Sequence, residues 1–344
     1  MKINDRNISK NFEPYIIAEL SANHGGSVER AKKSIYAAAK TGVSAVKIQT
    51  YQPTTMTIKC NKPDFLITKG LWAGKQLFDL YEEAHTPYEW HRELFDFANK
   101  IGITIFSTPF DESAVDLLEE LNTPAYKIAS FEINDTPLIK YIAKKNKPIF
   151  LSTGMASLDE IEEAVSTIRN NSASEILLFH CISGYPVPTK ESHLNNILHL
   201  KNRFKLEVGL SDHTSNNIAA ITAIGMGAVA IEKHFKLDDL ECGPDSSFSL
   251  NIPQLEDLVS QCIAAWQAKG SSKFSRSQIE EDNTLFRRSL YYVKNLCKGH
   301  VLTISDIRRI RPGFGISPKN LEKIIGCRII KDVEEGDPVS WKDF

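Results

Sequence analysis

Two short segments of the sequence each end an apolar run with a histidine. Gly209–Thr214 carries His213, Ile231–Phe235 carries His234, and the small, apolar residues between them have the pattern of a helix. A strand, helix, strand unit joins parallel neighbours by a right-handed crossover, so both carboxyl ends lie side by side. Either histidine alone is more often a hydrogen-bonded structural residue. As a pair at adjacent strand ends they have a common divalent-metal geometry, and we predict a metal site there.

Lysines and hydroxyls at the ends of other apolar runs predict an anion site on the same rim. Lys47 and Lys127 each lie within an apolar run, where an ammonium group is costly unless it meets a negative charge. One alternative for each lysine is an ion pair with a carboxylate such as Glu19 or Glu132. For the two lysines together we favour a cradle for phosphate and carboxylate groups. The polar residues at the ends of successive runs are Glu19, Lys47, Gln49, Ser107, Thr108, Lys127, Ser130, Glu132, Ser152, Thr153, Tyr185, Ser211, His213, Glu232 and His234.

Three carboxylates are candidates for the same rim. Burial raises the pKa of a carboxyl group, whereas nearby ammonium groups lower it. Glu19 and Glu132 are therefore both candidates for proton transfer, and the sequence does not choose between them. Asp245 follows the last run, at a place where an aspartate is usually a turn former, so its assignment rests on position alone.

The elements that must position these residues are short apolar runs alternating with amphipathic helical patterns. Helix starts are indicated at Thr86–Glu89, Asp135–Pro137 and Ser157–Glu160. The eight runs are Tyr15–Glu19, Val43–Gln49, Ile103–Thr108, Ala125–Ala129, Pro148–Ser152, Ile176–Cys181, Leu206–Ser211 and Val229–Lys233. This alternation predicts an α/β fold, a (β/α)8 TIM barrel with its active site at the carboxyl ends of the strands. An open doubly wound sheet would need a glycine-rich phosphate turn after its first strand, and Ala22–Gly26 is not one.

A long connection and a separate tail accompany the predicted barrel. The chain between Gln49 and Ile103 holds a polar loop and two helical patterns, and such loops on the catalytic face commonly serve as lids or substrate walls. We expect a barrel domain over residues 1–270, a linker over 271–286 and a small β-rich domain over 287–344.

The tail contains an internal repeat. Residues 299–307 and 336–344 share the order of their Gly, apolar, hydroxyl, Asp and apolar positions, which predicts a pseudo-symmetric domain. Short β-like runs are expected at Ser289–Val293 and Cys327–Ile330. A core of about sixty residues is marginal alone, so we expect this domain to pack on the barrel or on a neighbouring subunit.

Composition excludes several classes of protein. The chain has 344 residues with 41 Lys and Arg against 43 Asp and Glu, so no strong field attracts nucleic acid or an anionic membrane. No apolar run approaches the roughly 20 residues that span a bilayer, and the polar amino terminus predicts no signal peptide. The six cysteines are scattered without a CxxC pair. We expect reduced thiols in a cytoplasmic protein.

Five ordered blocks of sequence and the two histidine segments resemble the sialic acid synthase family, and within it the pseudaminic branch. They are Ile17–His24, Val46–Tyr51, Ser107–Asp111, Tyr126–Glu132, Leu151–Met155 and the two histidine segments. The resemblance runs from about Tyr15 to the carboxyl terminus, and the tail is similar to the antifreeze-like (SAF) domain of the family. It implies condensation of phosphoenolpyruvate with an N-acetylated six-carbon sugar to a nine-carbon nonulosonic acid, with release of phosphate.

The resemblance also implies roles for individual residues. His213 and His234 would hold a divalent metal, typically manganese, with magnesium or cobalt as alternatives, and the metal would polarise the sugar aldehyde. Arg311 would reach the active site of the partner subunit and meet the acyl group of the sugar, which implies a domain-swapped homodimer. The positions that match phosphoenolpyruvate-binding residues are Lys47, Thr108, Lys127, Ser130, Ser152 and Ser211. The positions that match residues facing the sugar or the reacting centre are Glu19, Gln49, Glu132, Tyr185 and Asp245.

The expected acceptor is 2,4-diacetamido-2,4,6-trideoxy-altrose, which gives pseudaminic acid. Ser183 stands where the sialic branch tends to carry a sugar-contacting Asn, and an apolar wall is expected where other acceptors carry a 6-hydroxyl. The nearest alternative is an N-acetylneuraminic or legionaminic acid synthase that uses N-acetylmannosamine or its 2,4-diacetamido analogue. A metal-dependent aldolase and a non-enzymatic carbohydrate-binding protein are the alternatives from other classes.

Overall fold

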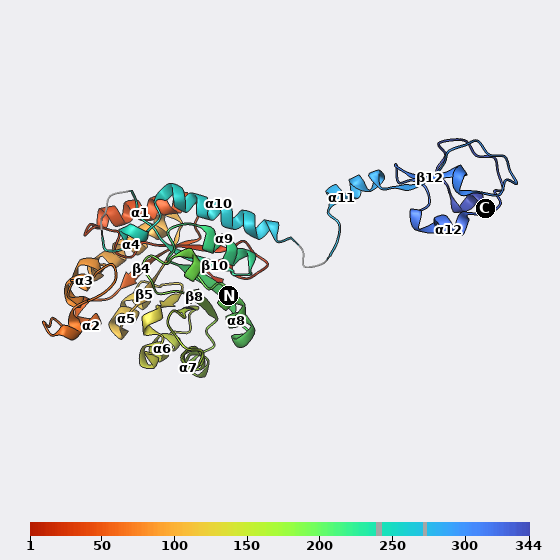
Figure 1. The fold of residues 1–344 in the computed structure, drawn as a ribbon. Coiled ribbons are helices and arrows are strands. Elements are labelled where there is room, and N and C mark those ends of the chain that lie inside the picture. The colour runs from red at the N-terminus through yellow and green to blue at the C-terminus, as the bar shows by residue number, and fades with distance from the viewer. Residues whose placement is uncertain (239–242, 271–273) are drawn as a thin grey trace. The chain divides into compact units, whose positions relative to one another are not determined.

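The first part of the chain is a closed barrel of eight parallel strands surrounded by helices (Figure 1). The computed structural model describes residues 1–238, 243–270 and 274–344, and the chain divides into the units Met1–Gly270 and Ser271–Phe344. The strands are β3 Tyr15–Glu19, β4 Ala45–Thr50, β5 Thr104–Pro109, β6 Tyr126–Ile128, β7 Ile149–Ser152, β8 Ile176–Cys181, β9 Glu207–Asp212 and β10 Ala230–His234. They pair in chain order, and β10 closes the barrel on β3. The predicted (β/α)8 fold is confirmed, and the strand ends differ from the predicted runs by at most two residues.

Helices connect the strands and cover the outside of the barrel. A short antiparallel pair, β1 Lys2–Ile3 and β2 Arg6–Asn7, precedes β3. The helices of this unit are α1 Val28–Lys40, α2 Pro53–Met56, α3 Leu77–Ala84, α4 Tyr88–Ile101, α5 Glu112–Glu120, α6 Thr136–Ala143, α7 Leu158–Asn171, α8 Asn195–Phe204, α9 Ile218–Gly225 and α10 Ile252–Ala268. None of the helices in the described ranges is long and apolar enough to cross a membrane.

Two of the three predicted helix starts are confirmed. Ser157 and Glu160 form a reciprocal capping box at α7, and the Asp135 side chain accepts from the Leu138 amide at α6. The start predicted at Thr86 is wrong, because α4 begins at Tyr88 and Pro87 occupies its N-cap with extended backbone angles.

The barrel interior is apolar near the amino ends of the strands and polar near their carboxyl ends. Buried aromatic and aliphatic side chains near the amino ends of the strands, including Tyr15, Phe106, Phe150 and Phe179, form one cluster. This packed layer is the floor on which the polar residues of the carboxyl ends stand. A second, larger cluster lies between the strands and the helices, for example Ile35 of α1 and Leu258 of α10.

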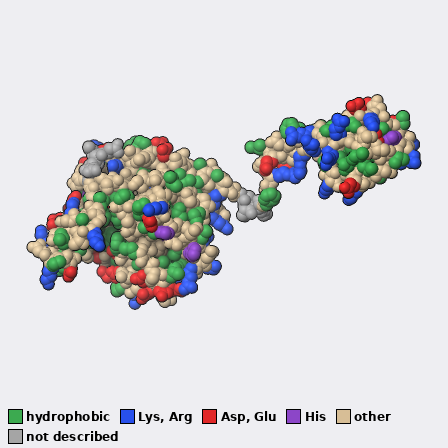
Figure 2. All heavy atoms as spheres, viewed as in Figure 1, with side chains coloured by type: hydrophobic (Ala, Val, Ile, Leu, Met, Phe, Trp, Pro, Cys, Tyr) green, Lys and Arg blue, Asp and Glu red, His purple; other side chains and the backbone are tan. Residues whose placement is uncertain are grey.

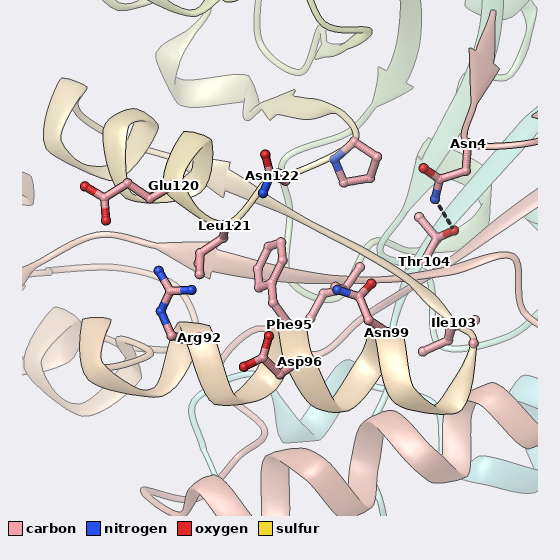
Figure 3. A pocket seen from close by; sticks show the side chains of 13 residues that line it. Asn4, Arg92, Phe95, Asp96, Asn99, Ile103, Thr104, Glu120, Leu121 and Asn122 are labelled. Atoms are coloured by element: carbon pink, nitrogen blue, oxygen red, sulfur yellow. Dashed lines mark hydrogen bonds between the residues drawn. The ribbon is translucent and has the colours of Figure 1, made fainter.

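Another cavity lies at the opposite, amino-terminal end of the barrel (Figure 3). It has a volume of about 390 Å³ and is bordered by Arg92 and Asn99 of α4, Glu120 of α5 and Asn122. None of the predicted site residues lines it. In a barrel of this kind chemistry takes place at the other end.

The second unit is small and built around a two-stranded antiparallel sheet. Strand β11 Ser289–Tyr292 pairs with β12 Ile307–Ile310. A short helix, α11 Gln278–Asp282, precedes them within the predicted linker, of which residues 271–273 lie outside the described ranges. The sheet packs with α12 Leu321–Ile324 around a core that includes Leu290 and Ile324.

The internal repeat is visible as two equivalent helical turns. Thr303 and Asp306 form a capping box at η6 Ile304–Asp306, and Ser340 and Asp343 form another at η8 Trp341–Asp343. The predicted β-like run Cys327–Ile330 forms an isolated antiparallel bridge, between Arg328 and Val301, rather than a longer strand. The Ile329 amide donates to the His300 carbonyl oxygen beside this bridge, and the Ile330 amide donates to Asp343. The five cysteines in the described ranges are free thiols, and Cys242 lies outside them.

Candidate active site

A cavity at the carboxyl ends of the barrel strands brings together ten of the predicted site residues. It has a volume of about 60 Å³, and Cys181, Glu232, Phe110, Ala129 and Phe131 complete its lining. The ten predicted residues are Lys47, Gln49, Thr108, Lys127, Ser130, Ser152, Tyr185, Ser211, His213 and His234. The two imidazoles and the two ammonium groups thus meet at one mouth of the barrel.

Strand pairing explains this convergence. In the parallel register His234 lies opposite Glu19, Glu19 lies opposite Lys47, and Glu232 lies opposite Ser211. Side chains alternate between the two faces of a strand, so every second residue of each strand points into the barrel. Residues from distant parts of the sequence therefore form one ring.

Two lysines and two glutamates form a buried charge cluster inside this ring. Lys47 Nζ lies 2.8 Å from Glu19 Oε2 and 3.8 Å from Glu232 Oε1, and Lys127 Nζ lies 2.6 Å from Glu232 Oε2. The Lys127 ammonium also stands 4.6 Å from the centre of the Phe179 ring in the apolar floor. The ion-pair alternative is thus realised for both lysines, and the carboxylate that meets Lys127 is Glu232 and not Glu132. A cluster of two positive and two negative charges is balanced by itself.

The neighbouring groups hold this cluster in place and shift its pKa values. Gln49 donates to Glu19 Oε1 at 3.1 Å, and Ser211 donates to Glu232 Oε1 at 3.1 Å. Burial raises the pKa of Glu19 despite the opposing effect of Lys47. Burial also favours the neutral form of Glu232, but the two lysines outweigh it and lower the pKa of Glu232 to about 2.

The two histidines face each other next to the charge cluster, with ring centres 5.4 Å apart. His213 Nδ1 lies 3.1 Å from the Ile182 carbonyl oxygen, and a proton donated there leaves the Nε2 lone pair available. His234 Nδ1 is buried and has no hydrogen-bond partner, and the Asp245 carboxylate lies 3.6 Å from it. Burial, followed by the charges of His213 and Lys47, lowers the pKa of His234 and so favours a neutral imidazole. Among the described residues no three His, Cys, Asp or Glu side chains gather closely enough to hold a metal by themselves.

Three predicted residues stand behind or above the cavity and do not line it. Glu19 is fully buried beneath Lys47. Asp245 is buried beside His234 and accepts from the Ser21 hydroxyl. Glu132 lies in the turn η2 Ser130–Glu132, where its Oε2 is buried without a hydrogen-bond partner and burial raises its pKa to about 7.

Arg311 belongs to the second unit, where it follows β12 and is exposed. Lys and Arg side chains gather over the part of this unit that carries β12 (Figure 2). The exposed arginines of the two strands and their flanks are Arg287, Arg288, Arg308, Arg309 and Arg311.

Several structural roles are not predicted by the sequence. The role of Glu232 as the counter-ion of Lys127 is one of them, although Glu232 precedes His234 by two residues and therefore lies on the same face of the strand. His24 is buried with its ring 5.5 Å from that of Trp90. Phe248, which had no signal in the sequence, packs 5.0 Å from His234 between ring centres.

Comparisons with known proteins agree with this geometry. Residues 34–274 match the model of the NeuB family, and residues 287–344 match the SAF domain. The chain is 40% identical over 344 residues to the pseudaminic acid synthase of Campylobacter jejuni subsp. jejuni strain 81-176, covering 100% of both chains. It is 38% identical over 326 residues to the N,N'-diacetyllegionaminic acid synthase of Campylobacter jejuni, covering 94% of this chain and 97% of that protein.

A solved structure of a related synthase has a similar fold. The crystal structure of N-acetylneuraminic acid synthetase from Leptospira borgpetersenii, in complex with citrate, matches with a TM-score of 0.75 at 28% identity, covering 82% of this chain and 94% of that chain. The resemblance that the sequence blocks indicate is confirmed. The chain is therefore an enzyme of the NeuB family, the family of the sialic acid synthases, with a carboxyl-terminal SAF domain.

Proposed function

We propose that this enzyme is a cytoplasmic transferase that makes pseudaminic acid. It would condense phosphoenolpyruvate with 2,4-diacetamido-2,4,6-trideoxy-altrose and water, and release phosphate. The observation that carries the proposal is the single cavity in which Lys47 and Lys127 meet His213 and His234. The 40% identity to a pseudaminic acid synthase over the whole chain supports this choice of acceptor.

The anionic substrate would bind at the lysines. Lys47 and Lys127 supply two ammonium groups in a buried setting, where charge-assisted hydrogen bonds to phosphate and carboxylate are strong. Hydroxyl donors surround them in the same cavity, from Thr108, Ser130, Ser152 and Ser211. On binding, the lysines would share their charge between the substrate and their present partners Glu19 and Glu232.

A divalent metal fits the pair of histidines. The buried His234 Nδ1 has no hydrogen-bond partner, His213 would offer Nε2 when its Nδ1 donates to the Ile182 carbonyl oxygen, and Asp245 lies beside His234. A balanced charge cluster cannot by itself neutralise a phosphorylated acid, so added positive charge is favourable there. We propose manganese, with magnesium or cobalt as alternatives, held by His213 and His234. When bound, such an ion polarises a carbonyl oxygen as a Lewis acid.

The remaining chemistry falls to the residues of the chain. The enol carbon attacks the aldehyde carbon, the aldehyde oxygen gains a proton, and positive charge develops at the carbon that carries the phosphate oxygen. Glu232 and Glu19 are the carboxylates that can offset this charge while water adds to that carbon. Glu19 or Glu132 accepts the proton of the water, and cleavage of the bond to the phosphate oxygen then releases phosphate and leaves the keto acid.

The SAF domain would complete the site in a domain-swapped homodimer. Arg311 is an exposed cation on this unit, and its guanidinium group is suited to the acyl group of the acceptor. We propose that it reaches the active site of the partner subunit.

The second candidate function is the same condensation with another acceptor. It is favoured by the 38% identity to an N,N'-diacetyllegionaminic acid synthase. Phosphate release would be measured with phosphoenolpyruvate and each of three acceptors: the trideoxy-altrose, the 2,4-diacetamido legionaminic precursor and N-acetylmannosamine. We expect turnover with the first to exceed that with the others by at least about tenfold. Equal turnover of N-acetylmannosamine would refute the pseudaminic assignment, and carbon–carbon bond formation without phosphoenolpyruvate would indicate an aldolase.

A further inference from the structure

Trp72 stands near the tip of a hairpin in the long connection between β4 and α4. Leu66 and Gln76 form an antiparallel bridge at the base of this hairpin. Gly70 and Gly74 flank the tip with φ angles of 83° and 93°, which allow the chain to turn tightly on both sides of Trp72. The connection thus presents one large aromatic side chain at a projecting turn.

The Trp72 indole is fixed to the loop that follows β10. Its Nε1–H donates to the Pro244 carbonyl oxygen at 3.1 Å. That loop approaches the barrel closely, because a Cβ on Gly243 would lie 2.4 Å from the Ala22 carbonyl oxygen. The only polar atom of the indole is therefore used within the protein, and the ring offers carbon atoms alone to a ligand.

Trp72, Tyr185 and Phe248 form an aromatic wall beside the two histidines. The ring centre of Tyr185 lies 5.4 Å from that of Trp72, 5.2 Å from that of Phe248 and 4.6 Å from that of His213. Phe248 lies 5.0 Å from His234. Trp72 is thus one ring farther from the histidines than Tyr185.

The size of the cavity directs an acceptor toward this wall. About 60 Å³ is far below the roughly 300 to 1,000 Å³ of ordinary ligand clefts, so a sugar must extend beyond the residues that line the cavity. In the proposed reaction its aldehyde lies at the histidines, and an acceptor that extends from there along Tyr185 would place its far end at Trp72. A hydroxyl that faced the carbon atoms of Trp72 and Phe248 would lose water without gaining a partner, whereas a methyl group would bury apolar surface.

We propose that Trp72 is a specificity-determining residue that packs on the 6-methyl end of the acceptor and discriminates against a 6-hydroxyl. This inference rests on the proposed function for the reaction, but it names a residue and a part of the substrate which that function leaves open. It predicts that the preference for a 6-deoxy acceptor resides in the indole and not in the charged residues of the cavity.

The test compares Trp72→Ala, Trp72→Phe and the wild-type enzyme with the trideoxy-altrose and its 6-hydroxy counterpart. Phosphate release gives kcat/KM for each acceptor and KM for phosphoenolpyruvate. We expect the wild type to prefer the 6-deoxy acceptor by about tenfold to a hundredfold. Trp72→Ala should reduce this preference by about tenfold or more and leave KM for phosphoenolpyruvate within about twofold, while Trp72→Phe should keep most of it. Leu71→Ala, an exposed neighbour in the same hairpin, is the matched control and should resemble the wild type.

An unchanged preference in Trp72→Ala would overturn the inference, whether kcat/KM stays the same for both acceptors or falls equally for both. A parallel rise in KM for phosphoenolpyruvate would also overturn it, because that result indicates a structural role for the hairpin. Failure of the proposed function is a separate result, seen in the wild type as a higher turnover of N-acetylmannosamine. In that event the same variants are compared on N-acetylmannosamine and its 6-deoxy analogue, with the same expected loss of preference.

Discussion

Lys127 and Glu232 lie 105 positions apart in the sequence and meet at 2.6 Å in the barrel interior. Both side chains are almost completely buried. Removing one partner would leave an unpaired charge, so Lys127→Met should lower the free energy of unfolding of the barrel by about 3–5 kcal/mol. The same change should abolish binding of phosphoenolpyruvate. Urea denaturation and calorimetric titration with phosphoenolpyruvate measure the two effects.

A second substitution separates the two effects. Lys127→Met combined with Glu232→Gln should recover part of the stability but none of the binding, because the buried charge is removed and the anion cradle stays incomplete. Lys145→Met breaks a surface pair of 2.9 Å with Asp116 and should cost less than about 1 kcal/mol. A double variant no more stable than Lys127→Met would show that the ion pair is not the source of the loss.

The two histidines can be tested through metal binding itself. His213→Ala and His234→Ala should each weaken manganese binding in calorimetric titration by more than about a hundredfold and reduce metal-dependent phosphate release in parallel. The circular dichroism of the barrel should not change. His193→Ala, an exposed histidine outside the cavity, serves as control. Undiminished manganese binding in either cavity variant would remove the metal assignment.

The sequence predicted the barrel and most of its rim, because strand alternation and strand order are local patterns. Most of the eight runs end in a polar residue, and a closed parallel barrel brings those ends together. The pairing of charges is not local. The sequence offers Glu19 and Glu132 as partners for the lysines, whereas Lys127 meets Glu232 of a strand that lies far along the chain. The packing of Phe248 beside His234, and of Trp72 beside Tyr185, likewise depends on loops whose course no periodicity describes.

Glu132 should give the enzyme a pH dependence near neutrality. Burial raises its pKa to about 7, from 4.5 for an ordinary glutamate. Between these pH values the folded protein keeps a proton that the unfolded chain has lost, so its contribution to stability is complete below pH 4.5 and is lost as pH rises through 7. Glu132→Gln should remove this loss. The difference in the free energy of unfolding between the variant and the wild type should therefore be up to about 3 kcal/mol more favourable to the variant at pH 8 than at pH 4.

The activity of the same variant tests the role of Glu132 in proton transfer. As the acceptor of the proton of the water Glu132 must be ionised, so kcat of the wild type should rise as pH rises through 7, and Glu132→Gln should lack this limb of the profile. Glu120→Gln, an exposed glutamate of α5, should keep the wild-type profile. Identical pH profiles in Glu132→Gln and the wild type would exclude Glu132 from proton transfer.

Arg311 tests the shared site of the proposed dimer. Arg311→Ala should raise KM for the sugar by about tenfold or more, as expected for a lost charged hydrogen bond, with little change in KM for phosphoenolpyruvate. Arg309→Ala, which removes another exposed arginine of the same unit, should have little effect.

Mixing experiments then examine the exchange between subunits. The Arg311→Ala variant lacks the residue proposed to meet the sugar, and the Lys127→Met variant lacks a residue proposed to bind phosphoenolpyruvate. Unfolding and refolding them together should form hybrid dimers in which one site has both residues, and activity should return to a measurable fraction of the wild type. Absence of any rescue in a mixture that forms dimers would contradict the swapped arrangement.

Strand β10 carries ionic side chains on both of its faces, and this makes the strand sensitive to insertions and deletions that shift its register. Glu232 and His234 face the cavity, while Lys233 between them points outward and binds Asp212 at 2.6 Å and the Thr214 carbonyl oxygen at 2.7 Å. A slip of one position would exchange the two sets and leave both without their partners. Insertion or deletion of a single codon before this strand should therefore be tolerated far less well than most amino-acid replacements within it.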